Sequence, residues 1–211
     1  MKTFKLYLCI VLLAFTMGLS AQSNPVYEQA MEKTLVKIDS ASSVKDLLSA
    51  RNQLERISLM YADEWLPPYY LAYVDIQSVY MGQKSEKVLE NAKANLDKLN
   101  AYAKADKSEV NTLLGYYYMA LIMLNPATNG QKYFNNVNSS FNKALEQNPD
   151  NPRAIYLSAF FEQNLPEALR SEKDFCAEMK KAKELYAKEH KSVEKPYWGE
   201  YFLNMISAQC K

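Results

Sequence analysis

From residue 25 onward, the hydrophobic positions of this chain recur at helical spacing, and no segment shows the two-residue alternation of a strand. Residues that start or end helices mark the boundaries: Asn24 and Pro25 supply an N-cap and a first-turn proline, and Gly82 ends another helix. The pattern therefore predicts about nine helices, at 25–38, 43–59, 69–81, 85–105, 110–124 and 135–147, after Pro152, and at 173–188 and 196–209. Asn, Pro and Gly between 125 and 130 predict a loop.

The predicted helices are of two kinds. Those at 69–81 and 113–124 are apolar on nearly every side, whereas those at 85–105 and 134–147 carry one apolar stripe and a charged face. A helix that is apolar all round must be covered all round. Alternation of the two kinds predicts an all-α fold made of a two-layer stack of helical hairpins.

An internal repeat supports this architecture. A leucine followed by a small residue occurs three times at intervals of 43 residues, as Leu71-Ala72, Leu114-Gly115 and Leu157-Ser158. A small side chain lets the two helices of a hairpin cross closely. We therefore predict that Ala72, Gly115 and Ser158 lie at helix crossings.

The middle copy of this repeat resembles the tetratricopeptide repeat (TPR) family. Leu114-Gly115 followed by Tyr118 is similar to the signature of that family's first helix, and Phe141, Ala144 and Pro149 are similar to the end of its second helix. The resemblance is specific over residues 108–150 and extends to the rest in outline. It implies a TPR-like α-solenoid, a right-handed stack of about four hairpins with a capping helix, for which a generic helical bundle is the alternative.

In that family the first helices line a concave groove that binds a partner. The resemblance implies that the groove residues of this chain are Tyr69, Tyr73, Thr112, Tyr116, Ile155 and Ala159. Tyrosine rings with polar tips suit peptide or glycan recognition. The same rings also suit a hydrophobic core, and the sequence leaves both interpretations open.

Net charge and composition narrow the function classes. The chain has 25 Lys and Arg against 24 Asp and Glu, a near-neutral balance that argues against nucleic acid as a partner. The single histidine, His190, lies in a charged segment that is typical of a solvated surface. With one histidine and two distant cysteines in the body of the chain, we expect no metal site and no cofactor.

The first residues resemble a secretory signal peptide, with a basic start at Lys2 and Lys5, an apolar run to Met17, and small residues up to Ala21. The sequence therefore predicts a cleaved leader at 1–21, a single helical-repeat domain at 22–211, and no membrane-spanning segment after cleavage. The leader and the Lys-, Asn- and Tyr-rich body resemble exported proteins of the Bacteroidetes. We expect a periplasmic or secreted protein.

Export makes a disulfide the first interpretation of the two remaining cysteines, Cys176 and Cys210. If helices 173–188 and 196–209 form an antiparallel hairpin, Cys210 lies roughly opposite residue 174. The alternative is a pair of buried thiols.

No catalytic constellation is recognisable, so the sequence favours a non-catalytic adaptor that binds a protein or peptide in a tyrosine-rich groove. A carrier of a small ligand or glycan is the alternative. A less favoured one is a glycan hydrolase that uses Asp63, Glu64 and a groove carboxylate such as Glu162.

Overall fold

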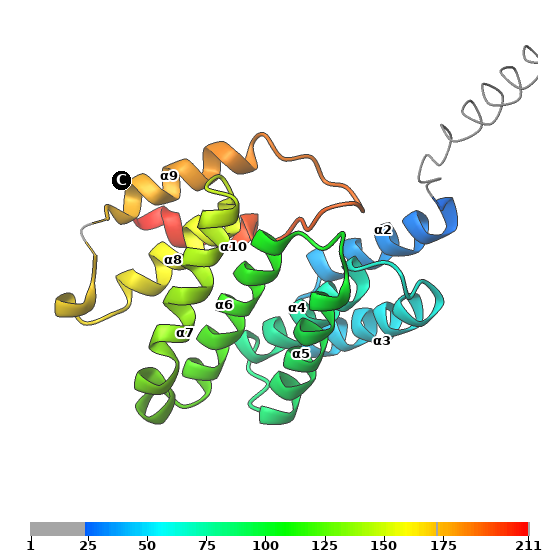
Figure 1. The fold of residues 1–211 in the computed structure, drawn as a ribbon, viewed down its shortest axis with the longest axis horizontal. Helices are drawn as coiled ribbons and strands as arrows, with labels where there is room; N and C mark the ends of the chain where they lie inside the picture. The colour runs from blue at the N-terminus through cyan, green and yellow to red at the C-terminus, as the bar shows by residue number, and fades with distance from the viewer. Residues whose placement is uncertain (1–23, 172, 211) are drawn as a thin grey trace, which may run out of the picture.

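The computed structural model describes residues 24–171 and 173–210, and the leader predicted at 1–21 lies outside them. Within these ranges the chain forms nine α-helices and three short 3₁₀ turns, with no strand, so the predicted all-α fold class is confirmed (Figure 1). The α-helices are α2 (Pro25–Asp39), α3 (Val44–Met60), α4 (Leu66–Tyr80), α5 (Glu86–Lys98), α6 (Lys107–Leu124), α7 (Pro126–Gln147), α8 (Pro152–Gln163), α9 (Phe175–Tyr186) and α10 (Glu200–Ile206).

Side-chain caps and prolines set the helix starts. The Asn24 side chain accepts hydrogen bonds from the backbone N–H groups of Val26 and Tyr27 at 3.1 and 3.2 Å, which satisfies donors that have no partner inside α2. Asn151 caps α8 in the same way, and the prolines that follow both caps occupy first-turn positions, where no N–H is needed.

Consecutive helices pack as four hairpins, α2/α3, α4/α5, α6/α7 and α8/α9, and the first helices also contact one another, α4 against α6 and α6 against α8. Each inner first helix is thus covered on several sides. This explains why thirteen of the fifteen residues of α4 are buried, whereas α5 buries only one stripe.

The three small residues of the repeat are all buried at their positions in α4, α6 and α8. At Gly115 the reason is visible, because a Cβ atom there would lie 2.7–2.9 Å from three ring carbons of Phe141 in α7. Helices α6 and α7 approach each other so closely at this point that only glycine fits without displacing the ring.

The predicted loop at 125–130 is wrong, because helix α7 begins at Pro126 directly after α6 ends at Leu124. Asn125 alone makes the connection, and its side chain accepts a hydrogen bond from the Thr128 N–H at 3.3 Å. The proline is at the first helical position, and nothing lies within 4 Å of a Cβ atom built at Gly130, so neither residue interrupts the helix.

The predicted helix at 196–209 is also wrong over its first turn. Residues 187–199, which we call the strap, form no helix; they leave the end of α9, run towards α2 and return to α10 (Figure 1). Helix α10 begins only after Gly199, whose φ of 95° stops a helix from extending backwards through it.

Candidate functional site

The six residues predicted to line a groove are all buried. Tyr69 and Thr112 are fully buried, and even Tyr73, the most exposed of the six, has only 8 % of its surface exposed. They therefore do not line an open groove in this structure. The strap covers the tyrosines among them with the side chain of Trp198, itself 4 % exposed.

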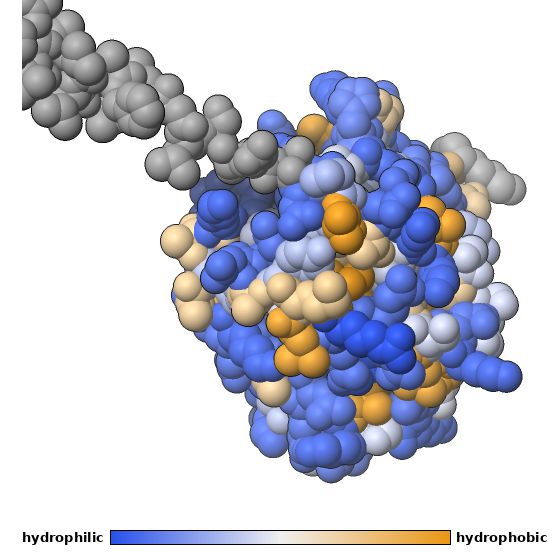
Figure 2. All heavy atoms as spheres, turned by 90° about the vertical axis from the view of Figure 1, so that its right-hand side faces the viewer, coloured by the Kyte–Doolittle hydropathy of each residue, from blue (hydrophilic) through white to orange (hydrophobic). Residues whose placement is uncertain are grey.

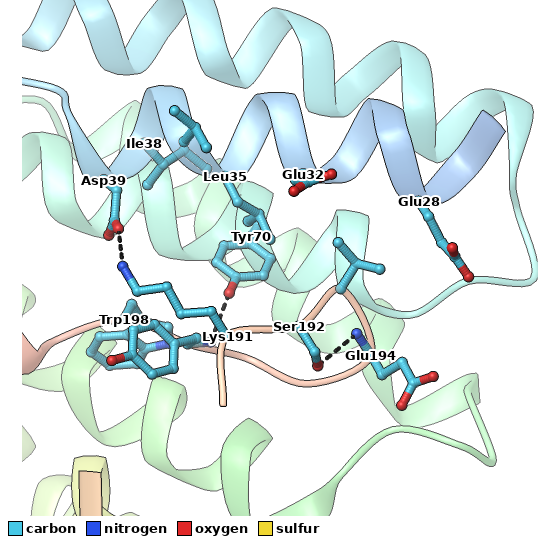
Figure 3. Close-up of a pocket in the computed structure, with 13 residues that line it drawn as sticks. Glu28, Glu32, Leu35, Ile38, Asp39, Tyr70, Lys191, Ser192, Glu194 and Trp198 are labelled. Carbon is cyan, nitrogen blue, oxygen red and sulfur yellow. Dashed lines mark hydrogen bonds and ion pairs between the residues drawn. The ribbon is translucent and has the colours of Figure 1, made fainter. Parts of the chain in front are cut away.

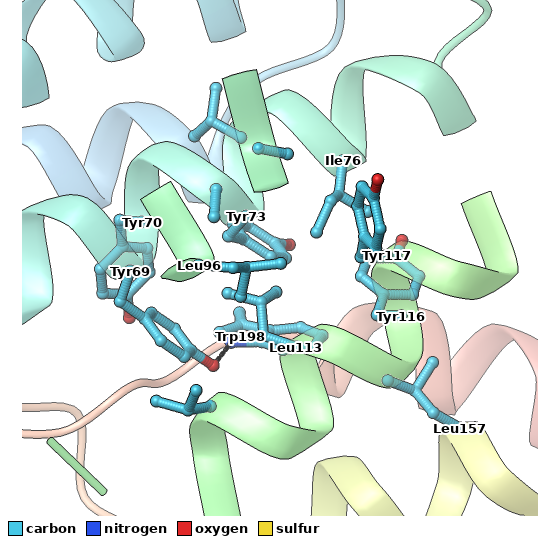
Figure 4. Packing of buried hydrophobic residues seen from close by; sticks show 14 of the residues in the cluster. Tyr69, Tyr70, Tyr73, Ile76, Leu96, Leu113, Tyr116, Tyr117, Leu157 and Trp198 are labelled. Atoms are coloured by element: carbon cyan, nitrogen blue, oxygen red, sulfur yellow. Dashed lines mark hydrogen bonds between the residues drawn. The ribbon is translucent and has the colours of Figure 1, made fainter. Parts of the chain in front are cut away.

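Trp198 lies between two of the predicted groove tyrosines (Figure 4). Its ring centroid is 4.6 Å from that of Tyr73 and 5.6 Å from that of Tyr116, with interplanar angles of 34° and 25°. Tyr80 extends the stack on the far side of Tyr116 at 4.6 Å. The indole N–H of Trp198 donates a hydrogen bond to the Tyr69 hydroxyl at 2.8 Å, so the ring is fixed by both stacking and a polar contact.

A buried polar chain continues from Tyr69. Its hydroxyl donates to a carboxylate oxygen of Glu109 at 3.0 Å, and Arg153 donates to the same carboxylate at 2.9–3.0 Å. Arg153 also donates to Glu189 in the strap at 2.7 and 2.9 Å. One guanidinium thus joins two carboxylates and ties the strap to the first helices of the stack. Burial raises the pKa of the Tyr69 hydroxyl well above its usual value, so it remains a donor at neutral pH.

A pocket of about 450 Å³ lies between α2 and the strap, a volume in the range of small-molecule sites (Figure 3). Tyr70, whose hydroxyl accepts the backbone N–H of Tyr197 at 2.9 Å, joins this pocket to the strap. The lining is mostly aliphatic and aromatic, with polar residues among it. It consists of Glu28, Glu32, Leu35, Val36, Ile38, Asp39, Tyr70, Lys191, Ser192, Val193, Glu194, Tyr197 and Trp198.

Charges in the pocket lining are unevenly distributed. Four of the lining residues are acidic, and Lys191 is the only basic one among them. The Lys191 ammonium is 2.7 Å from an Asp39 carboxylate oxygen and 4.8 Å from the ring centroid of Tyr197. Burial and the hydrogen bond to Glu200 raise the pKa of the Tyr197 hydroxyl to about 12, so this ring is uncharged at neutral pH.

The carboxylates of the hydrolase alternative do not share a cleft. Asp63 is exposed and lines a shallow depression whose other charged residues are Lys98 and Lys104. The Glu162 carboxylate accepts a hydrogen bond from the Ser171 hydroxyl and lies 3.8 Å from the Lys173 ammonium. Among residues 24–171 and 173–210, no three His, Cys, Asp or Glu side chains cluster as a metal site would require, and His190 is exposed.

The cysteines predicted as a candidate pair form a disulfide in the structure. Cys176 and Cys210 are bonded, with their Cα atoms 5.5 Å apart, and the bond joins the first turn of α9 to the end of the chain. In the part of the chain that the structure describes, no helix has the length and apolar character needed to cross a bilayer.

Sequence reasoning did not identify Trp198 or Lys191 as site residues. The lysines and glutamates of the strap resemble a self-paired solvated surface, and only Gly199, one of few glycines in the chain, marks a special backbone position nearby. The contacts that make the site join residues 127, 129 and 152 positions apart in the chain. A local pattern contains no signal for contacts at such distances.

Together the stacked hairpins, the strap and its pocket define an all-helical protein with a ligand-sized pocket between α2 and the strap. No known family profile and no curated protein matches the sequence. Among solved structures the chain is similar to the HusA haemophore from Porphyromonas gingivalis, a member of the Bacteroidetes. The two are 27% identical, the likeness covers 92% of this chain and 96% of that chain, and the TM-score is 0.78.

Proposed function

We propose that this chain is an exported, non-catalytic binding protein of the cell envelope that holds a flat, largely apolar ligand of the porphyrin type in the strap pocket. The observation that carries the proposal is the pocket itself, a ligand-sized cavity with aliphatic and aromatic walls. The nearly full-length likeness to a haemophore supports the ligand class. The proposal includes a cleaved leader at 1–21, a single domain at 22–211, periplasmic or extracellular location, and the TPR-like character that the 43-residue spacing supports.

The volume and the lining chemistry of the pocket suit a planar macrocycle. Leu35, Val36 and Ile38 on α2 supply aliphatic surface, and Tyr197 and Trp198 on the strap supply aromatic surface. Apolar and aromatic walls stabilise a flat ring by removing its two faces from water. The strap residues come from a non-helical segment, so the pocket has one helical and one irregular wall.

The lining residues also indicate how such a ligand would be held. They include no histidine, cysteine or methionine, and the two tyrosines of the lining, which could also ligate haem iron, already use their hydroxyls within the protein. The Tyr70 hydroxyl accepts the Tyr197 N–H, and the Tyr197 hydroxyl donates to Glu200. Binding would therefore depend on contact with the ring rather than on a strong iron ligand. We expect a metal-free porphyrin and haem to bind with similar affinities.

The test is a titration of residues 22–211 with haem and with protoporphyrin IX, followed by porphyrin absorbance and by quenching of tryptophan fluorescence. Val36→Glu places a charge on the aliphatic wall at a side chain that is 62% exposed, so the fold should tolerate it. We expect it to weaken binding at least tenfold. Leu59→Glu is the matched control, because Leu59 is 83% exposed on α3 and lies outside the pocket. Absence of binding, or equal effects of the two substitutions, would refute the proposal.

A second candidate is the predicted adaptor role, in which the tyrosine groove binds a protein or peptide. The strap favours it, because the chain's own Tyr197-Trp198-Gly199 segment lies against these tyrosines much as a bound peptide would. A partner would have to displace that segment. A synthetic peptide of residues 191–199 should bind Trp198→Ala more tightly than the unchanged protein; no binding to either would argue against this role.

A further inference from the structure

We propose that Lys191 recognises a carboxylate of the ligand, so that the strap pocket selects planar ligands that carry a carboxylate. In this inference, which rests on the proposed function, Asp39 holds the Lys191 ammonium while the pocket is empty and yields it to the ligand. The ligand class is thereby narrowed from apolar planar molecules to planar carboxylic acids.

The position of Lys191 supports this role. It is the only basic residue in the pocket lining, and it reaches from the strap across the pocket to Asp39 on α2 (Figure 3). The ammonium also lies over the ring of Tyr197, a contact that favours this position over one directed into solvent. A ligand whose ring packs on the pocket walls would place its edge within reach of this ammonium.

The energetics of the existing ion pair permit an exchange of partners. The side chains of Lys191 and Asp39 are 63% and 54% exposed, and an ion pair of this exposure typically changes an equilibrium by no more than about fivefold. Replacing the Asp39 carboxylate by a ligand carboxylate therefore costs little. The ammonium keeps one anionic partner throughout.

The acidic residues of the pocket lining limit the number of ligand carboxylates that can enter the pocket. Glu28, Glu32 and Glu194 also line the pocket, and no second cation lines it to balance them. A second ligand carboxylate directed into the pocket would face these groups and be repelled. A dicarboxylate ligand should thus bind with one carboxylate at Lys191 and the other directed to solvent.

The experiment compares mesoporphyrin IX with its dimethyl ester, which has the same ring but no carboxylates. Because the ligand carboxylate replaces the Asp39 carboxylate, the unchanged protein should prefer the free acid by no more than about twofold, and the two- to fivefold ratio of one full exposed ion pair is expected only when Asp39 no longer competes. Lys191→Met should abolish this preference and leave ester binding unchanged. Asp39→Asn should increase the preference, because it removes the competing carboxylate.

Lys188→Met is the matched control, since Lys188 is an exposed strap residue outside the pocket lining, and it should leave the preference unchanged. If porphyrins bind but Lys191→Met retains the acid-over-ester preference, this inference is overturned and the proposed function stands. If neither porphyrin binds the unchanged protein, both are overturned.

Discussion

The two central hairpins and the C-terminal segment of this molecule are held in place by different kinds of contact. In α4–α7, stabilisation is spread over many buried aliphatic and aromatic side chains that pack between adjacent helices. The strap is held by a few individual contacts instead: Trp198 lies in the tyrosine stack, Glu189 pairs with Arg153, and the Tyr197 N–H bonds to Tyr70. After it, α10 buries Leu203 and Ile206, and a disulfide joins Cys210 to α9. A region held at few points should be far more sensitive to single substitutions, and it is also the region that forms one wall of the pocket.

The largest effect should come from Trp198→Ala. Removing a buried tryptophan leaves a cavity between Tyr73 and Tyr116, and such truncations typically lower the free energy of unfolding by about 3–5 kcal/mol. Urea denaturation measures the change. Tyr201→Ala is the control, because Tyr201 on α10 is 84% exposed, and it should change the free energy of unfolding by less than about 0.5 kcal/mol. Equal effects would show that the strap is not anchored at Trp198.

Removal of the disulfide should have the next largest effect. The double substitution Cys176→Ser and Cys210→Ser opens a loop that spans 34 positions, and we expect a loss of about 2–4 kcal/mol. The comparison is sharpened by hydrogen exchange, in which amides of α10 should lose protection and those of α4 should keep it in the native state. Equal loss in both helices would contradict the distinction between the two regions.

Glycine substitutions compare the C-terminal segment with the central hairpins through smaller changes in the free energy of unfolding. Gly199→Ala combines a left-handed φ of 95° with a Cβ atom that would collide with the Tyr156 hydroxyl and lie 2.9 Å from that of Tyr186. We expect a loss of about 2–3 kcal/mol in urea denaturation. Gly130→Ala, in the interior of α7 with open space around it, should instead stabilise the protein by about 0.5–1 kcal/mol. A neutral Gly199→Ala would mean that the turn into α10 is not fixed.

The smallest effect concerns the aromatic stack at high pH. Burial raises the pKa of Tyr80 above its usual value of about 10, so its neutral form is favoured in the folded state. The corresponding stabilisation is fully present below pH 10 and is lost as the pH rises above 10. Its hydroxyl has no hydrogen-bond partner among the described residues, so Tyr80→Phe should leave the free energy of unfolding at pH 7 unchanged or raise it by up to about 1 kcal/mol.

The same substitution should reduce the loss of stability between pH 8 and pH 11, measured by urea denaturation at each pH. An unchanged pH dependence would mean that Tyr80 does not need to ionise when the protein unfolds in alkali.

Much of the central architecture could be predicted from the sequence, because there the signal is local. Apolar positions on every side of 69–81 and 113–124 indicate inner helices, and the 43-residue spacing places Gly115 at a close approach to Phe141. The candidate groove residues come from the resemblance to the tetratricopeptide repeat family, and the sequence does not indicate that the strap covers the groove tyrosines.

The strap could not be predicted in this way. Trp198 is fixed by Tyr69, which lies 129 positions earlier, and Lys191 by Asp39, which lies 152 positions earlier. The strap sequence has no periodic pattern from which these long-range contacts could be predicted. The Lys- and Glu-rich composition around Glu189 suggested a solvated surface, although this carboxylate pairs with a buried arginine.

The bond between Cys176 and Cys210 encloses the whole strap within a covalent ring. A protease that cut the exposed residues near Lys188 would therefore leave both fragments attached, and the product would separate into two bands only after reduction. Damage to the wall of the pocket in an oxidising compartment would then be local: a nicked molecule would keep its last helix tethered to α9, in a position to re-form its contacts.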